Sequence, residues 1–372
     1  MDNIKEYLLW TILLILLIIF GYIFNKLTLK TENCIRINKN KYETLTSIFD
    51  STDTILTKFD VPLKKTFVKT AYNCCCAGNF KNDYVDMCAL DNCIKNGVRA
   101  FHFEIYSLNN NPIIASSTIA EPKYKEIYNY LEFATIMSHI KNECTDSTNT
   151  DYNLNSDPLF LIFEIHSDIY NTYTAIYNTL TTTFKQTNGT SLISDDSKGN
   201  PQKLMDITLN NLKNKIIFLI LPRNINHYTS SSLNTISVQL NSGNLITYSY
   251  YMNSINKIGT TIDFEDTADK SDTDYLDKLN ILIPNKQLYN DNYDFKSSGI
   301  RGGITFIGMK YQFNGTQLKE YNQLFNSYAF SLKYYTENNK YYSPVINQLL
   351  QLSNLTDSIT KDDYNKINEF FS

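Results

Sequence analysis

The sequence lacks the short motifs that identify several large classes of enzyme. It has no glycine-rich loop that would hold a phosphate and no serine elbow of the α/β-hydrolase kind. Basic residues number 34 and acidic residues 38, so the net charge of −4 offers no basic surface for nucleic acid. No internal repeat is visible either. These absences argue against phosphate-loop enzymes, serine hydrolases and nucleic-acid binding.

Cysteine is sparse, at seven residues, and three of the seven are adjacent in Cys74–Cys76. An odd number with three neighbours does not suit an ordinary disulfide framework. Adjacent residues of a strand point to opposite faces, and no second cysteine or histidine pair lies at zinc-binding spacing. We therefore expect reduced thiols in a reducing compartment. A cysteine–histidine nucleophile is the remaining alternative for this segment.

One long apolar run stands near the N-terminus. Tyr7–Phe24 contains 18 residues without a charge, enough to cross a bilayer at about 1.5 Å per residue. A cleaved signal peptide is the alternative, but the run exceeds the usual apolar core and no small-x-small cleavage site follows. Lys5 precedes the run, and five basic residues follow it: Lys26, Lys30, Arg36, Lys39 and Lys41. We expect a single-pass membrane protein, anchored by this helix, with its bulk on the cytoplasmic side.

Strand-like and helix-like segments alternate after residue 60. The expected strands are 66–73, 98–106, 112–116, 158–167, 215–221, 303–313 and 328–335, and the expected helices are 82–97, 127–142 and 169–184. This alternation is typical of a parallel α/β sheet. With this many units, it favours a (β/α) TIM-type barrel.

The chain is expected to divide into seven parts, because composition and rhythm change along it. A polar insertion rich in Ser, Asn and Asp separates two half-barrels, and a helical tail follows the second half. In order, the parts are the tail 1–6, the transmembrane anchor 7–24, the juxtamembrane segment 25–60, the first half-barrel 61–222, the insertion 223–279, the second half-barrel 280–335 and the tail 336–372.

Polar side chains stand where four expected strands end, and in a barrel of this type these ends form the site. They are Tyr72 with Asn73, His102 with Glu104, Ser116 with Ser117, and Glu164 with His166. Asn73, Glu104 and Glu164 offer oxygen ligands of the kind that a hard cation such as Ca²⁺ prefers. Simpler roles stay open for two residues, since Asn73 could cap a turn and His166 could be an ordinary core residue.

Six stretches follow one another in an order shared with a known family. They are PLKKTFVKTAYNCCCAG, NGVRAFHFEIY, NPIIASSTI, PLFLIFEIHS, LNNLKNKIIFLI, and IGMKYQF with TQLKEYNQLF. Together they resemble the catalytic barrel of phosphoinositide-specific phospholipase C, with the polar insertion between its X and Y halves. The set is also similar to membrane-anchored phospholipase-C-like proteins of large DNA viruses.

The resemblance implies phosphodiester cleavage by two histidines. One assists attack of the inositol 2-hydroxyl, and the other protonates the leaving group, while Ca²⁺ stabilises charge on the phosphate. Aligned on this sequence, the first histidine falls on Tyr72. The second falls on Ser117, or on Ser116 if the loop is shifted by one residue. Neither a phenol nor a hydroxyl titrates near neutral pH.

This sequence has only some of the residues that the resemblance implies for binding the metal and the substrate. Asn73 and Glu164 match the family's metal ligands, whereas its Glu-x-Asp pair becomes His102-x-Glu104. The substrate-binding arginine of the second half has no clear counterpart, and Lys286 is the nearest basic residue.

Three hypotheses follow from these positions. The first is a membrane-anchored, catalytically degenerate barrel that binds a phospholipid or protein partner, or has a structural role at a membrane or virion. It rests on the loss of two acid–base groups, each of which contributes about 10²–10⁴-fold. The second is an active phosphodiesterase with a rebuilt cation site that uses His102. The third is an unrelated function on a similar fold.

Overall fold

The computed structural model describes the N-terminal helix and the strands and helices of the sheet that follows it. The residues described are 2–39, 44–49, 61–119, 125–145, 154–185, 201–240, 245–250, 279–284, 292–300, 304–325 and 327–333. The expected helical tail 336–372 and Lys286 lie outside these residues.

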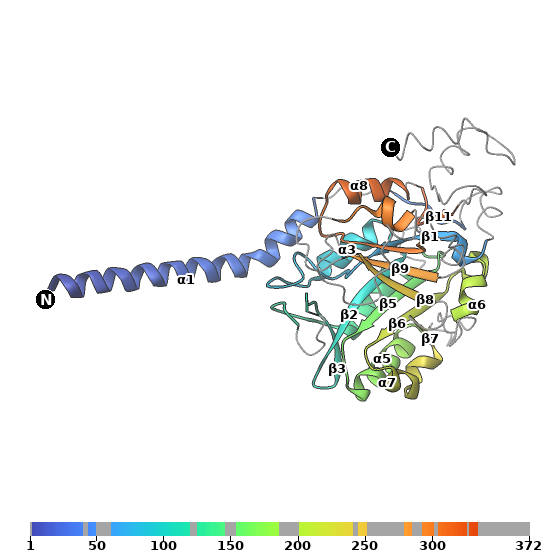
Figure 1. The fold of residues 1–372 in the computed structure, drawn as a ribbon, viewed down its shortest axis with the longest axis horizontal. Helices are drawn as coiled ribbons and strands as arrows, with labels where there is room; N and C mark the ends of the chain where they lie inside the picture. The colour runs from blue at the N-terminus through green and yellow to red at the C-terminus, as the bar shows by residue number, and fades with distance from the viewer. Residues whose placement is uncertain are drawn as a thin grey trace, which may run out of the picture.

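Eight parallel strands form one curved sheet (Figure 1). They are β1 (Thr66–Ala71), β2 (Ala100–Leu108), β5 (Leu159–Ile165), β6 (Ile216–Pro222), β7 (Ser237–Gln239), β8 (Leu245–Tyr250), β9 (Leu279–Pro284) and β10 (Phe306–Met309). Neighbours pair in the order β7-β6-β5-β2-β1-β10-β9-β8. Read as a circle that starts at β1, this order follows the chain, as in a (β/α) barrel. The predicted TIM-type fold is confirmed.

Three short strands pair antiparallel at the margins of this sheet. β3 (Asn111–Ile114) folds back on β2, β4 (Leu131–Glu132) pairs with β3, and β11 (Phe330–Leu332) pairs with β1. The sheet also reaches into the segment expected as a polar insertion, because β7 and β8 both lie within it. β7 is only three residues long, too short for a periodic signal, whereas β8, LITYSY, is rich in strand-forming Ile, Thr and Tyr and was hidden only by the polar composition around it.

Helices connect the strands. They are α3 (Met87–Lys95), α4 (Phe133–Thr145), α5 (Tyr170–Thr183), α6 (Pro201–Asp206), α7 (Ile225–Ser230) and α8 (Thr316–Gln323), with single turns at Leu63–Lys65, Leu209–Leu212, Ser232–Thr235 and Lys296–Ile300. Asp86 caps α3 by accepting a hydrogen bond from the Cys88 amide. The expected end of this helix at Gly97 is confirmed, because Gly97 adopts a φ of 69° just after it.

Apolar side chains fill the space between the strands and the helices. β5 and β6 are buried along almost their whole length, as expected for parallel strands covered on both faces. Aromatic rings from different strands pack together, with Phe163 against Phe103 and Phe218, and Phe160 against Phe306. At the amino-terminal end of the strands, the buried Arg99 guanidinium donates to backbone carbonyl oxygens just before β5. This core holds the strand ends in fixed positions.

The first helix, α1 (Asp2–Ile37), projects from the rest of the described chain, which we call the body (Figure 1). Its residues 7–24 are exposed. Among the residues described, it is the one helix long and apolar enough to cross a membrane. The helix continues for 13 residues beyond Phe24 without a break, so the expected anchor and the start of the expected juxtamembrane segment form one continuous helix.

Candidate functional site

The predicted site residues meet where β1, β2 and β5 end, which we call the site end of the sheet. Tyr72 and Asn73 follow β1, whereas His102 and Glu104 lie on β2 directly beside Ile162 and Glu164 of β5. Ser116 and Ser117 follow β3, which folds back along β2. Parallel strands bring these positions together because their carboxyl ends share one edge of the sheet.

Glu104 is the centre of the cluster, and its side chain is fully buried. Four protein groups donate hydrogen bonds to its carboxylate. The Tyr72 hydroxyl (3.2 Å) and the Asn73 amide (3.0 Å) reach Oε1, while the Tyr106 hydroxyl (2.9 Å) and the Ser117 backbone N–H (3.4 Å) reach Oε2. A carboxylate offers about four lone-pair sites, so these donors match its capacity.

Asn73 holds an unusual position beside this carboxylate. Its φ is 45°, in the left-handed region that asparagine tolerates better than most residues. Its side-chain amide also donates to the Ser116 hydroxyl at 3.0 Å. The buried Oδ1 atom has no hydrogen-bond partner among the described residues. The turn-capping alternative therefore leaves this oxygen unexplained.

Two histidines flank Glu164 of β5. His102 Nε2 lies 3.5 Å from Oε2 of this carboxylate, and His166 Nε2 lies 3.1 Å from Oε1. Each ring stacks on a tyrosine, with His102 against Tyr72 at 4.6 Å and His166 against Tyr106 at 4.9 Å between ring centroids. His102 is 1% exposed and His166 8%, so solvent reaches neither ring freely.

The two tyrosines remain neutral donors. Burial, followed by the negative charges of Glu104 and Glu164, raises the pKa of Tyr72 well above its ordinary value. Burial and the Glu104 charge likewise raise the pKa of Tyr106. Both phenols therefore keep their protons at neutral pH and cannot accept one from a substrate hydroxyl.

A second carboxylate orders the loop that carries Ser117. Glu126 Oε2 accepts hydrogen bonds from the Ser117 hydroxyl (3.1 Å) and from both the backbone N–H and the hydroxyl of Thr118. Desolvation opposes ionisation of Glu126, but these hydrogen bonds outweigh it and lower its pKa. The Ser117 hydroxyl is thus oriented toward Glu126, while its backbone N–H faces Glu104.

Comparison of the sequence with known proteins matches no family model and no curated protein. Comparison of the structure does find relatives. Crystal structures of PLC21 from L. pealei and S. officinalis share 10% identity with this chain at TM-scores of 0.53 and 0.55. Each match covers 74% of this chain. The chain has a phospholipase-C-like barrel fold.

The extent of these matches differs between the relatives. The phospholipase-C-like barrel spans only 38% and 37% of the two PLC21 chains. A calcium-dependent phosphoinositol-specific phospholipase C from a Pseudomonas species matches over 74% of this chain and 96% of its own, with 10% identity and a TM-score of 0.41. At these identities the likeness establishes the fold alone.

The phospholipase-C-like barrel does contain a group of side chains that could hold a metal ion. One ligand atom each from Glu104, Glu164 and His166 lies within 4.8 Å of the others. Calcium prefers six to eight oxygen ligands, which suits the carboxylates and the Asn73 Oδ1 atom but not an imidazole. Four protein donors already occupy Glu104. The group is thus consistent with a possible Ca²⁺ ion, while the imidazole and the hydrogen bonds to Glu104 count against it.

Sequence reasoning missed Tyr106 and left the role of His166 open. Tyr106 was read only as part of a strand, although it lies two residues beyond Glu104 and so on the same face. His166 was left as a possible core residue, yet its ring lies beside Glu164. The i, i+2 spacing to a buried carboxylate was the available signal in both cases.

The prediction for the cysteines was partly wrong. Cys74, Cys75 and Cys76 are free, buried thiols, and burial raises the pKa of Cys74 and Cys75, which makes them poor nucleophiles. Cys34 and Cys88, however, form a disulfide. Seven cysteines allow one disulfide beside five free thiols, so the odd number of cysteines could not exclude this pair.

Proposed function

We propose that this chain is a membrane-anchored phospholipase-C-like barrel that does not perform the family reaction and has a binding or structural role at a membrane. One observation carries the proposal. Tyr72 and Ser117 stand where the resemblance requires the two histidines, and the hydroxyl of each donates a hydrogen bond to a protein carboxylate, Tyr72 to Glu104 and Ser117 to Glu126. The side chains at both acid–base positions are therefore neutral groups that donate to carboxylates of the protein itself.

The energetic consequence of this replacement is large. Each general acid or base contributes about 10²–10⁴-fold, so the loss of both removes about 5–11 kcal/mol of transition-state stabilisation. A phenol that keeps its proton and a hydroxyl oriented toward Glu126 supply no substitute. Substrate positioning by the barrel does not offset a loss of this size.

A second candidate is a cation-dependent phosphodiesterase with a rebuilt site. It is favoured by the two imidazoles beside Glu164 and by the buried nitrogens of His102, neither of which makes a hydrogen bond among the described residues. Lys286, expected to bind substrate, lies outside those residues. A residual Ca²⁺ ion would belong to this candidate. We favour the degenerate barrel because His102 is buried beneath Tyr72, where a lipid headgroup would not reach it.

The test is release of inositol phosphate from vesicles that contain phosphatidylinositol, with the full-length chain and either Ca²⁺ or a chelator. We expect no release above a protein-free control. Turnover that disappears in His102→Ala or His166→Ala would replace this proposal with the second candidate. The matched control is His139→Ala, whose ring lies on α4 and contacts Asp91 instead of the site.

Two observations make opposite predictions for the side of the membrane on which the body lies. The basic residues after Phe24 favour the cytoplasmic side, of a host cell or of a virion if the chain is viral. The Cys34–Cys88 disulfide favours an oxidising compartment. The acceptor sequence at Asn314, on an exposed residue, distinguishes them, because only a body outside the cytoplasm would be glycosylated there.

A further inference from the structure

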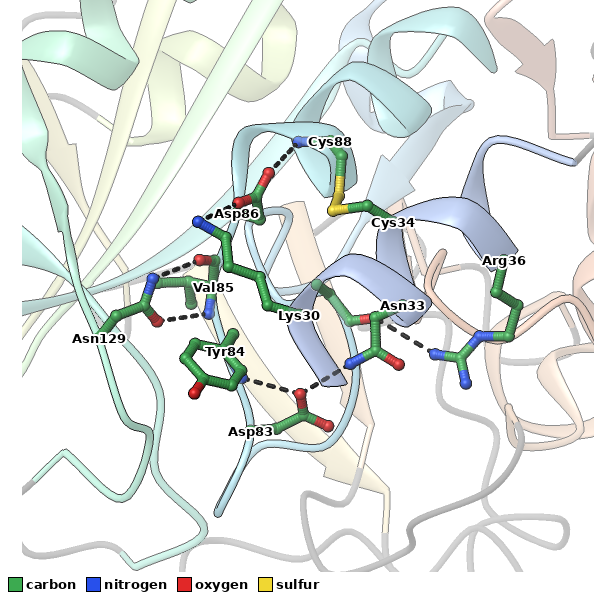
Figure 2. The surroundings of a disulfide bond; sticks show 11 residues. Lys30, Asn33, Cys34, Arg36, Asp83, Tyr84, Val85, Asp86, Cys88 and Asn129 are labelled. Carbon is green, nitrogen blue, oxygen red and sulfur yellow. Dashed lines mark hydrogen bonds and ion pairs between the residues drawn. A yellow bond between two sulfur atoms is a disulfide. The ribbon is translucent and has the colours of Figure 1, made fainter. Parts of the chain in front are cut away.

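The C-terminal part of α1 is fastened to the body at the site end (Figure 2). We call this set of contacts the clamp. Its members are the Cys34–Cys88 disulfide, the Lys30–Asp86 ion pair at 2.8 Å, the hydrogen bond from Asn33 Nδ2 to Asp83 Oδ1 at 2.7 Å, and the hydrogen bond from Arg36 to the Ala77 carbonyl oxygen at 3.3 Å. All four body partners lie between the end of β1 and the first turn of α3. The clamp therefore attaches to the segment that begins with Tyr72 and Asn73.

The clamp is close-packed as well as polar. A Cβ atom at Gly78 would collide with the Asp83 carboxylate and the Asn33 amide, so only glycine allows these groups to meet. The Asn33 and Asp83 side chains are buried, and Ile37 packs beside Ala77. A covalent bond, a buried hydrogen bond and close packing together fix the direction in which α1 leaves the body.

A second contact lies nearer the apolar run. The Lys26 ammonium lies 5.7 Å from the centre of the Tyr22 ring and 5.8 Å from that of Tyr128. Tyr128 belongs to the loop after Ser117, and its backbone N–H donates to the Asp83 carbonyl oxygen. A residue within the predicted membrane span thus lies beside the site-end loops of the body.

The depth of these residues follows from helix geometry. An 18-residue run rises about 27 Å at 1.5 Å per residue, close to the hydrocarbon thickness of about 30 Å. Phe24 therefore marks the edge of the hydrocarbon, with Tyr22 about 3 Å inside it and Lys26 about 3 Å outside it. Tyrosine and lysine are the residue types enriched at this boundary. Tyr128 and Tyr130 are each 42% exposed, so their rings are available to a lipid surface.

We propose that the site end of the barrel rests on the bilayer that α1 crosses, with Tyr128 and Tyr130 at the level of the lipid headgroups and the clamp fixing this orientation. The proposal rests on the anchoring role proposed above for α1. It gives the binding role a definite surface. Whatever the body recognises at its site end is presented by, or lies within, the headgroup layer of its own membrane.

The test uses the single native tryptophan, Trp10, which lies in the apolar run. The full-length chain is reconstituted in phosphatidylcholine vesicles with or without brominated acyl chains, which quench tryptophan at short range. Native Trp10 reports insertion of α1. In a Trp10→Phe background, Tyr128→Trp reports the site end, Tyr130→Trp is a second reporter there, and Asn211→Trp is the matched control. Asn211 is exposed and precedes β6, at the opposite end of the sheet.

We expect strong quenching of Trp10 and at least threefold more quenching at position 128 or 130 than at position 211. Equal, weak quenching at 128, 130 and 211, with Trp10 quenched, would overturn the orientation and leave the anchoring intact. An unquenched Trp10 would overturn the anchoring and, with it, this inference.

A further variant tests the clamp itself. Cys34→Ser combined with Asp83→Asn removes the disulfide and weakens the buried contact with Asn33. We expect quenching at position 128 to fall toward that at position 211, while quenching of Trp10 persists. Unchanged quenching at position 128 would show that the clamp does not set the orientation. Circular dichroism of each variant confirms that the comparison is between folded proteins.

Discussion

The Glu104 cluster and the clamp both involve the segment that begins with Tyr72 and Asn73, yet their polar groups have different roles. Around Glu104, neutral hydroxyl and amide donors surround a carboxylate with no exposed surface. In the clamp, charged and covalent contacts join two separate parts of the chain, and the Lys30–Asp86 pair is partly exposed. The first arrangement stabilises a core, whereas the second fixes an orientation.

The difference between the two regions shows two ways in which polar groups are accommodated at the site end of the sheet. A buried carboxylate is tolerated when every lone pair is satisfied, and Glu104 meets that condition without an ion. The hydrogen-bond donors to this carboxylate are neutral hydroxyl, amide and backbone groups. The clamp then gives the same end of the sheet a defined relation to α1.

The largest expected effect on the free energy of unfolding comes from substitution of Glu104. Glu104→Ala leaves two phenols, one amide and one backbone N–H without their acceptor, and each unsatisfied donor costs about 1–3 kcal/mol. Even with partial relaxation, we expect the free energy of unfolding to fall by about 4 kcal/mol, measured by urea denaturation. Glu104→Gln keeps an acceptor and the side-chain volume, so it should lose less than half as much. Equal losses would mean that the hydrogen bonds are not what Glu104 contributes.

The disulfide of the clamp comes next. It joins residues 54 apart in sequence, for which loop closure in the unfolded chain predicts at most about 4 kcal/mol and measured values are typically about 2–4 kcal/mol. We expect Cys34→Ser to lower the free energy of unfolding by about 2–3 kcal/mol. Cys144→Ser, which changes a buried free thiol, is the control for loss of sulfur alone. A Cys34→Ser loss no larger than the control would contradict a stabilising role.

The smallest effect is expected at a contact that belongs to neither region. His139 Nε2 lies 2.7 Å from Asp91 Oδ1, and this hydrogen bond raises the pKa of the imidazole. The stabilisation is complete below the ordinary pKa of about 6.5 and is lost as the pH rises through the raised value. Because both groups are partly exposed, His139→Gln should cost about 0.5 kcal/mol or less at pH 5.5. The difference in Tm from wild type should disappear by pH 9, and a difference that grows with pH would show the opposite sign.

Much of the fold was predictable because its signals are local. The apolar run of β5, the amphipathic turns of α3 and Gly97 at the end of that helix each follow from a few neighbouring residues. β7, which pairs with β6, was missed because it has only three residues, and β8, which pairs with β9, was missed because it lies within a stretch of polar composition.

The proximity of most candidate residues could be predicted from the sequence, but the hydrogen bonds among them could not. Alternation along β2 and β5 placed Glu104 and Glu164 at one edge, whereas the contacts of the Tyr72 hydroxyl and the Ser117 backbone N–H with Glu104 depend on side-chain and loop positions that spacing does not encode. The Cys34–Cys88 pair was hidden for a related reason. Its members belong to separate elements, and only the path of α1 past Ala77 brings them together.

The most direct test of whether protein donors already satisfy the Glu104 carboxylate is a calcium titration of the full-length chain in detergent micelles. The measured quantity is the Tm of the protein at each calcium concentration. A ligand at 100 times its Kd adds about 2.7 kcal/mol to the stability of a folded protein, which a Tm measurement detects easily. If four protein donors already satisfy Glu104, millimolar Ca²⁺ should raise Tm no more than the same concentration of Mg²⁺. A saturable, calcium-specific rise in Tm that is lost in Glu104→Gln and Glu164→Gln would contradict this account.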